Sequence, residues 1–245
     1  MRVDEDKCVG CLECLDYCPV GAISEVAGGI VSIDEDECVE CGCCLRMGVC
    51  EYEAIWQPEL QWPRILRAHF SDPRTAHPST GIVGRGTDEI KTNDVTGMYP
   101  RGCIGIAVEL GRPGLGVRMY DVEKVAQAVI PLGVEFAEDN PIYHLFQDLT
   151  QGKFREDILG EKVLSAILEF KTTAAKVPQV LKALHRAARE VDTVISMNIA
   201  SMFEPDGSLP AEIVSRDAGF EIRPNGKSNV GLGLPVQRDF PGGKQ

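Results

Sequence analysis

Repeated apolar patterns in the middle of the chain predict a folded α/β domain over residues 101–203. Apolar residues alternate with other residues over 104–110 and again over 162–170, which is typical of half-buried strands. Two further strands are predicted at 134–137 and 194–199. Amphipathic helices are predicted from two sets of apolar residues at helical spacing: Val122, Val125, Ala126 and Val129, and Val177, Val180, Leu181, Leu184, Ala188 and Val191.

The predicted order of these elements is strand, helix, strand, strand, helix, strand. This is the order of the ferredoxin-like βαββαβ sandwich, a fold without iron that many unrelated proteins share. A short helix is expected at 142–149, between the second and third strands. Residues 204–245 are rich in Gly and Pro and lack periodicity, so we expect an irregular, extended C-terminal tail. The predicted fold class is α+β.

Eight of the nine cysteines in the first 58 residues form two similar runs. The first run has the spacing C-x2-C-x2-C-x3-C followed by proline, and the second has the spacing C-x2-C-x2-C-x5-C. The cysteines are Cys8, Cys11, Cys14 and Cys18 in the first run, and Cys38, Cys41, Cys44 and Cys50 in the second. Thiolates at this spacing are typical ligands of [4Fe-4S] clusters.

Zinc and disulfide bonds are weaker interpretations of the same cysteines. Structural zinc prefers two C-x2-4-C pairs, which these triplets fit poorly. Disulfides require an oxidising compartment, and residues 1–10 carry charges where a signal peptide would be apolar. We therefore expect a cytoplasmic protein with reduced, metal-binding cysteines.

An internal duplication surrounds the two runs. Residues 4–23 (DEDKCVGCLECLDYCPVGAI) align with residues 34–55 (DEDECVECGCCLRMGVCEYEAI), with a two-residue insertion in the second copy. Each copy is predicted to contain a short strand, a cysteine-rich loop and a short helix, followed by a returning strand. A domain of this size usually needs a metal or another crosslink for stability, so loss of bound clusters should unfold it.

On these motifs, residues 1–58 resemble a bacterial-type 2[4Fe-4S] ferredoxin. The resemblance implies two [4Fe-4S] clusters with crossed ligands, because in that family the fourth cysteine of each run binds the other cluster. One implied ligand set is Cys8, Cys11, Cys14 and Cys50, and the other is Cys38, Cys41, Cys44 and Cys18.

Two features of the second copy depart from this family. The spacer before Cys50 is longer than usual, and Glu51 stands where the family has proline. Both changes predict a looser loop at Cys50 and a shifted potential of the cluster that it helps to hold. The second run also contains an additional thiol, Cys43, which we expect to be a spare, semi-buried cysteine rather than an alternative ligand.

Charge is distributed unevenly between the two parts of the chain. The net charge is −12, and residues 1–60 contain 14 acidic but only three basic residues. The remaining 185 residues contain 23 acidic and 22 basic residues. An acidic domain steers basic partners, although solubility alone would also explain it. The charge argues against a nucleic-acid partner, and no apolar run approaches the ~20 residues of a membrane span.

Residues 59–100 are predicted to connect the two domains. Trp56 and Trp62, near the start of this segment, are expected to pack the domains together. The stretch 80–97 is rich in glycine and polar residues but lacks a G-x-G-x-x-G fingerprint. It is a candidate ligand loop, with a structural turn or an intersubunit loop as the alternative. Its candidate residues are Arg85, Lys91, Asn93 and Asp94.

Over residues 1–200, the chain resembles iron–sulfur proteins of anaerobic reductases, such as 6-hydroxynicotinate reductase-type proteins, through the stretch GRGTDEIKTNDVTG that follows the ferredoxin-like segment. The first hypothesis is an electron-transfer subunit whose α/β domain docks it to a partner oxidoreductase or to a second copy of itself, as a homo-oligomer. The second is a reductase that binds a small anionic substrate, although no flavin motif and no catalytic residue is recognisable. The third is a ligand- or redox-responsive regulator. The four histidines are scattered and predict no site.

Overall fold

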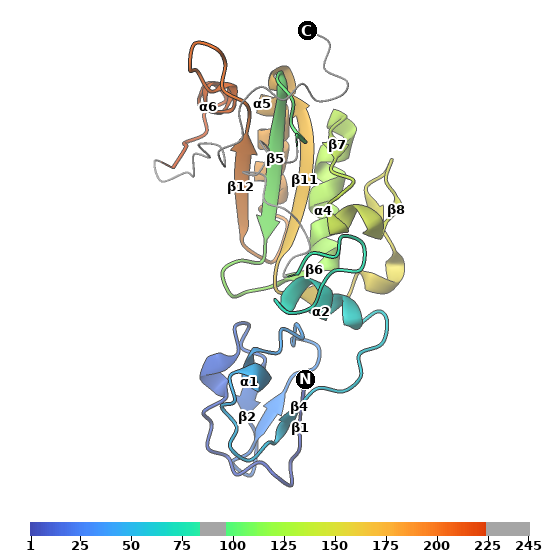
Figure 1. Ribbon diagram of the computed structural model, residues 1–245, viewed down its shortest axis with the longest axis vertical. Helices are drawn as coiled ribbons and strands as arrows, with labels where there is room; N and C mark the ends of the chain where they lie inside the picture. The colour runs from blue at the N-terminus through green and yellow to red at the C-terminus, as the bar shows by residue number, and fades with distance from the viewer. Residues whose placement is uncertain (84–96, 224–245) are drawn as a thin grey trace.

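The computed structural model describes residues 1–83 and 97–223. Figure 1 shows two bodies stacked along the long axis of the molecule. The N-terminal body contains residues 1–58. The larger α/β body contains the described residues from 59 onward. Together they form a mixed α+β structure.

The N-terminal body is built from two small antiparallel sheets that repeat the same plan. Strand β1 (Arg2–Val3) pairs with β4 (Ile55–Trp56), and β2 (Ile23–Glu25) pairs with β3 (Val31–Ile33). The short helices η1 (Leu15–Tyr17) and α1 (Cys43–Arg46) occupy corresponding positions in the two copies. The buried core is small and includes three cysteines: Cys14, Cys38 and Cys44.

The α/β body contains a four-stranded antiparallel sheet with the order β12-β5-β11-β7. Its strands are β5 (Cys103–Leu110), β7 (Glu135–Phe136), β11 (Ala166–Thr173) and β12 (Ile195–Ala200). Helices α4 (Met119–Val129) and α5 (Val177–Ala187) share one hydrophobic core with the sheet. The alternating residues of β5 are almost completely buried in this core: Ile104, Ile106, Val108 and Leu110.

Smaller elements surround this sheet. Strand β6 (Val117–Arg118) pairs with β10 (Lys162–Val163), and β8 (Phe146–Asp148) pairs with β9 (Lys153–Phe154). The remaining short 3₁₀ helices are η3 (Ile130–Leu132), η4 (Pro141–Leu145), η5 (Glu156–Ile158) and η6 (Ala174–Lys176). None of the helices in the described part of the chain is long and apolar enough to cross a membrane.

Two predicted elements in the middle of the chain are wrong in detail. The predicted strand at 162–170 is two strands, because the chain leaves its partner β6 after Val163 and pairs with β5 from Ala166 onward. The predicted helix at 142–149 is only the 3₁₀ helix η4, and it is followed by strand β8. Phe146 turns away from the helix to pack against Phe136 and Phe154.

Two helices lie in segments that were expected to be irregular. Helix α2 (Ile65–Ser71) lies in the predicted connector, and its residues Leu66 and Phe70 are buried in the core of the α/β body. Helix α6 (Pro210–Asp217) lies in the predicted tail and begins at a proline, which is well suited to the first turn of a helix. The described part of that tail is therefore not wholly extended.

Candidate metal centre

Eight cysteines of the N-terminal body surround two separate hollows. The first hollow also contacts Val9 and Tyr52. Its cysteines are Cys8, Cys11, Cys14 and Cys50. The second hollow also contacts Pro19 and Val39. Its cysteines are Cys18, Cys38, Cys41 and Cys44.

Each run therefore places three cysteines at one hollow and its fourth cysteine at the other. This is the crossed grouping that the resemblance to bacterial ferredoxins implies. The fold produces it because each fourth cysteine ends the loop that leads back to the other copy. That these thiols bind iron remains a prediction, and their grouping fits a cluster with four thiolate ligands.

Backbone amides donate to corresponding sulfur atoms in the two copies. The amide of Ala22 lies 3.1 Å from Cys18 Sγ, and the amide of Ala54 lies 3.3 Å from Cys50 Sγ. The Met1 ammonium group lies 3.8 Å from Cys38 Sγ. Such donors stabilise thiolate charge, and they tune the potential of a cluster that the sulfur atoms hold.

Burial makes the free thiols poor acids. It raises the pKa of Cys44 to about 12 and that of Cys41 to about 11, with neighbouring cysteine thiols adding to the effect. Burial also raises the pKa of Cys14. Because metals bind thiolates, iron must displace protons from these sulfur atoms.

The sulfur atoms are spread around each hollow. Among the described residues, no three His, Cys, Asp or Glu side chains converge closely enough to hold a single metal ion. In a cubane cluster each thiolate binds a different iron atom, so cluster ligands lie farther apart than the ligands of one ion. The spread of the sulfur atoms is compatible with such a cluster.

The loop that leads into Cys38 and Cys41 also joins the two bodies. Arg67 of α2 is 3% exposed and donates to the carbonyl oxygens of three loop residues. Those residues are Glu35 at 3.1 Å, Asp36 at 2.7 Å and Cys38 at 2.8 Å. Arg67 also forms an ion pair with Glu161 at 2.5 Å. One buried guanidinium thus links the α/β body to a cysteine-bearing loop.

Side-chain ion pairs strengthen the same junction. Arg118 lies 2.7 Å from Asp36 and 2.6 Å from Glu37, and Lys162 also pairs with Glu37. The hydrogen bond from Arg118 lowers the pKa of Asp36, and the one from Lys162 lowers the pKa of Glu37. Both carboxylates are therefore held in their charged forms.

Glu40 is completely buried at the junction. It accepts hydrogen bonds from the Met1 ammonium group at 2.6 Å and from Arg64 at 2.8 Å. Burial alone would raise the pKa of Glu40, but these two cations outweigh it and lower the pKa. The cations keep this carboxylate charged where an unpaired charge would be strongly unfavourable.

A comparison with known protein families identifies the first cysteine run. Residues 1–24 match the 4Fe-4S binding domain family. The match includes Cys8, Cys11, Cys14 and Cys18. Comparisons with curated proteins and with solved structures give no match. The chain thus contains a 4Fe-4S binding domain at its N-terminal end, and the match supports an iron–sulfur electron-transfer role.

The candidate ligand loop, Cys43 and the two tryptophans lie outside the two hollows or beyond the described residues. Arg85, Lys91, Asn93 and Asp94 lie outside the described residues. Cys43 begins α1, is partly buried and contacts neither hollow. Trp62 donates to Asp157 at 2.5 Å and therefore joins the connector to the α/β body, whereas Trp56 is 43% exposed on β4.

Sequence reasoning missed two features of the site and its surroundings. The cations Arg67, Arg118 and Lys162 are far apart in sequence, and only the fold brings them to the cysteine-bearing loop. His69 and His77 lie 5.5 Å apart between ring centroids, next to Phe70. A helical period over residues 65–71 would have placed His69 on α2, but that helix is too short for the period to be clear.

Proposed function

We propose that the chain holds two [4Fe-4S] clusters and transfers single electrons to or from a partner oxidoreductase. The observation that carries this proposal is the presence of two separate hollows in one small body, each surrounded by four cysteines. Two clusters in adjacent hollows would allow electrons to pass between them. The chain's own groups would hold the clusters through thiolates and tune them through amide donors at Cys18 and Cys50.

The α/β body would support this electron-transfer body and present it to the partner. We interpret its sheet and helices as a ferredoxin-like βαββαβ sandwich, and the strand order β12-β5-β11-β7 supports this interpretation. We also propose that the protein is cytoplasmic and that the α/β body is the surface for any homo-oligomer. These proposals rest on sequence reasoning.

Anaerobic purification with quantification of iron, acid-labile sulfide and flavin tests the proposal. Two clusters require about eight iron and eight sulfide per chain, and the reduced protein should give the electron paramagnetic resonance spectrum of two interacting clusters. The single variant Cys43→Ser is the matched control, because Cys43 contacts neither hollow and should leave the iron content unchanged. About four iron per chain would contradict the second cluster, and zinc without sulfide would contradict both.

A further inference from the structure

The duplicated domain contains the same acidic turn twice. The backbone amide of Cys8 donates to the carbonyl oxygen of Asp4 at 3.1 Å, and the amide of Cys38 donates to that of Asp34 at 2.9 Å. In both turns the aspartate side chain also accepts the amide two residues later. Residues 4–6 and 34–36 both read Asp-Glu-Asp, and each turn leads into the first cysteine of a run. The two turns are thus equivalent in sequence and in conformation.

The second turn is a docking surface within this molecule. Arg67 of the α/β body donates to the backbone carbonyl oxygens of Glu35 and Asp36, and Arg118 pairs with the Asp36 carboxylate. Val39, just after Cys38, is 1% exposed, and a side chain at Gly116 of the α/β body would lie 3.5 Å from it. Pro19 completes this surface, because a side chain at Gly114 would lie 3.1 Å from its carbonyl oxygen. The α/β body thus contacts Asp36, Val39 and Pro19. Its contacting face carries the cations Arg67 and Arg118.

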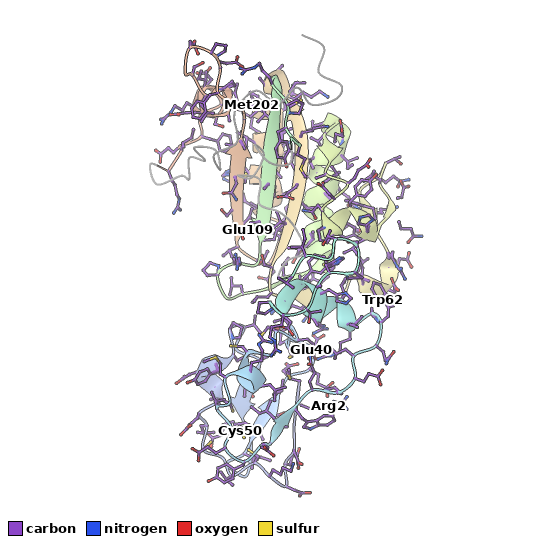
Figure 2. The ribbon with its side chains drawn as sticks, viewed as in Figure 1. Arg2, Glu40, Cys50, Trp62, Glu109 and Met202 are labelled. Carbon is purple, nitrogen blue, oxygen red and sulfur yellow. The ribbon has the colours of Figure 1, made fainter. Side chains whose placement is uncertain are left out.

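The first turn presents the equivalent residues to solvent. Glu5 and Asp6 are exposed, and Val9, which corresponds to Val39, is 57% exposed. Glu51, which corresponds to Pro19, is exposed as well. The α/β body is joined to the other turn: Figure 2 labels Glu40 near the junction of the two bodies and Cys50 farther from it. The valine of the second copy is therefore covered by the α/β body and that of the first is open, whereas the carboxylates of both turns reach solvent, with Glu35 48% and Asp36 72% exposed.

The open copy lies beside the first hollow. Cys11, Val9 and Tyr52 all contact the first hollow and are all exposed, the last by 51%. At the second hollow Cys38 and Cys44 are buried, and Val39 and Pro19 face the α/β body. A separate protein that covers Val9 and Tyr52 therefore lies directly against the first hollow.

We propose that Glu5, Asp6, Val9 and Glu51 form a docking surface for a basic redox protein, which binds this copy as the α/β body binds the other. The inference rests on the proposed function, since it needs a cluster in the first hollow. The partner presents Arg or Lys side chains around a small apolar contact. In the second copy Glu37 pairs with Arg118 and Lys162 of the α/β body. The first copy has Lys7 at this position, and because Lys7 is itself a cation, the partner needs fewer cations at that point.

The carboxylates of this surface should increase the rate of electron transfer to a basic partner. Carboxylates around an exposed redox site increase the frequency of productive encounters with a basic partner, mainly through the association rate. In the transfer step one electron leaves a reduced cluster, which becomes oxidised, and the one-electron acceptor of the partner is reduced. No proton or bond is exchanged.

Cytochrome c, a basic protein with a ferric haem, is a suitable probe acceptor. The test compares electron transfer from the reduced holoprotein in two double variants with the same charge change. Glu5→Lys/Asp6→Lys alters the proposed surface, whereas Glu138→Lys/Glu190→Lys alters exposed residues of the α/β body. At low salt the second-order rate constant should fall at least ~10-fold in the first variant and less than ~3-fold in the second. At about 0.5 M salt the difference should largely disappear.

Equal decreases in the two double variants would overturn the proposal, because only net charge would then matter. Unchanged rates in both would also overturn it. Iron and sulfide are measured in every sample, so an absence of clusters in the unaltered protein is recognised as failure of the proposed function instead. Should Glu5→Lys/Asp6→Lys lose iron, Glu51→Lys provides the same comparison against Glu138→Lys, with a smaller expected decrease.

Discussion

The two bodies of this protein are stabilised in different ways. The strands of the N-terminal body contain two or three residues each, and its small core includes three cysteines. The α/β body has two central strands of eight residues and a large core of aliphatic and aromatic side chains. Apolar burial can stabilise the second body alone, whereas the first lacks the area for this. We therefore expect cofactor binding and folding to be coupled in the N-terminal body and independent of each other in the α/β body.

The largest effect should come from removing a buried cysteine. Cys44→Ser is expected to reduce the iron content by at least half and to unfold the loops around the second hollow, because Cys44 is only 8% exposed and faces that hollow. Hydrogen exchange should show lost protection around 31–44 and unchanged protection in β5 and β11. Loss of protection in both bodies would contradict their independence. Cys103→Ser, in the α/β body, is the control.

A smaller effect should come from separating the bodies at Arg67. Arg67→Gln leaves three carbonyl oxygens and Glu161 without their buried donor. Loss of such a partner costs about 2–4 kcal/mol, measured as the free energy of unfolding in denaturant. Arg216→Gln removes an exposed pair with Glu212 and should cost less than ~1 kcal/mol. Similar values for the two variants would argue against a structural junction at Arg67.

The smallest effect should be a pH dependence of the α/β body through His77. Burial lowers the pKa of His77 to about 4, with additional contributions from His69 and His144. The unfolded state therefore binds a proton before the folded state does as pH falls. The resulting stability is complete above the ordinary pKa of about 6.5 and is lost as pH falls from there toward 4, by on the order of 1 kcal/mol between pH 7.5 and 5.5.

His77→Leu should flatten this slope, measured by denaturant unfolding of the α/β body at several pH values. His185→Gln, at an exposed position of α5, should retain it. An unchanged slope in His77→Leu would assign the pH dependence to other groups.

The sequence predicts regular, long elements better than short or interrupted ones. Strand β5 and helices α4 and α5 are confirmed near their predicted positions, because each contains enough residues for its apolar period to be clear. Helix α2 has only seven residues, and prolines precede it, so its period is not evident. The alternation over 162–170 continues across the break at Leu164, where only tertiary contacts reveal the change of partner.

The local spacing of the cysteines indicated the metal site from the sequence alone, whereas the long-range packing around that site could not be predicted. The cysteine spacing identified both runs, and the family match covers the first of them. The junction at Arg67 and the difference between Val9 and Val39 depend on contacts between distant segments. Identical residues in the two copies thus have different surroundings, which no local pattern encodes.

The most direct test of the central claim, two clusters with crossed ligands, is hydrogen exchange of the iron-loaded Cys18→Ala variant together with its iron content. Cys18 lies in the first run but contacts the second hollow. We predict that about half of the iron is lost, that protection falls around 38–44, and that it is retained around 8–14. Loss of protection around 8–14 with retention around 38–44 would contradict the crossed arrangement.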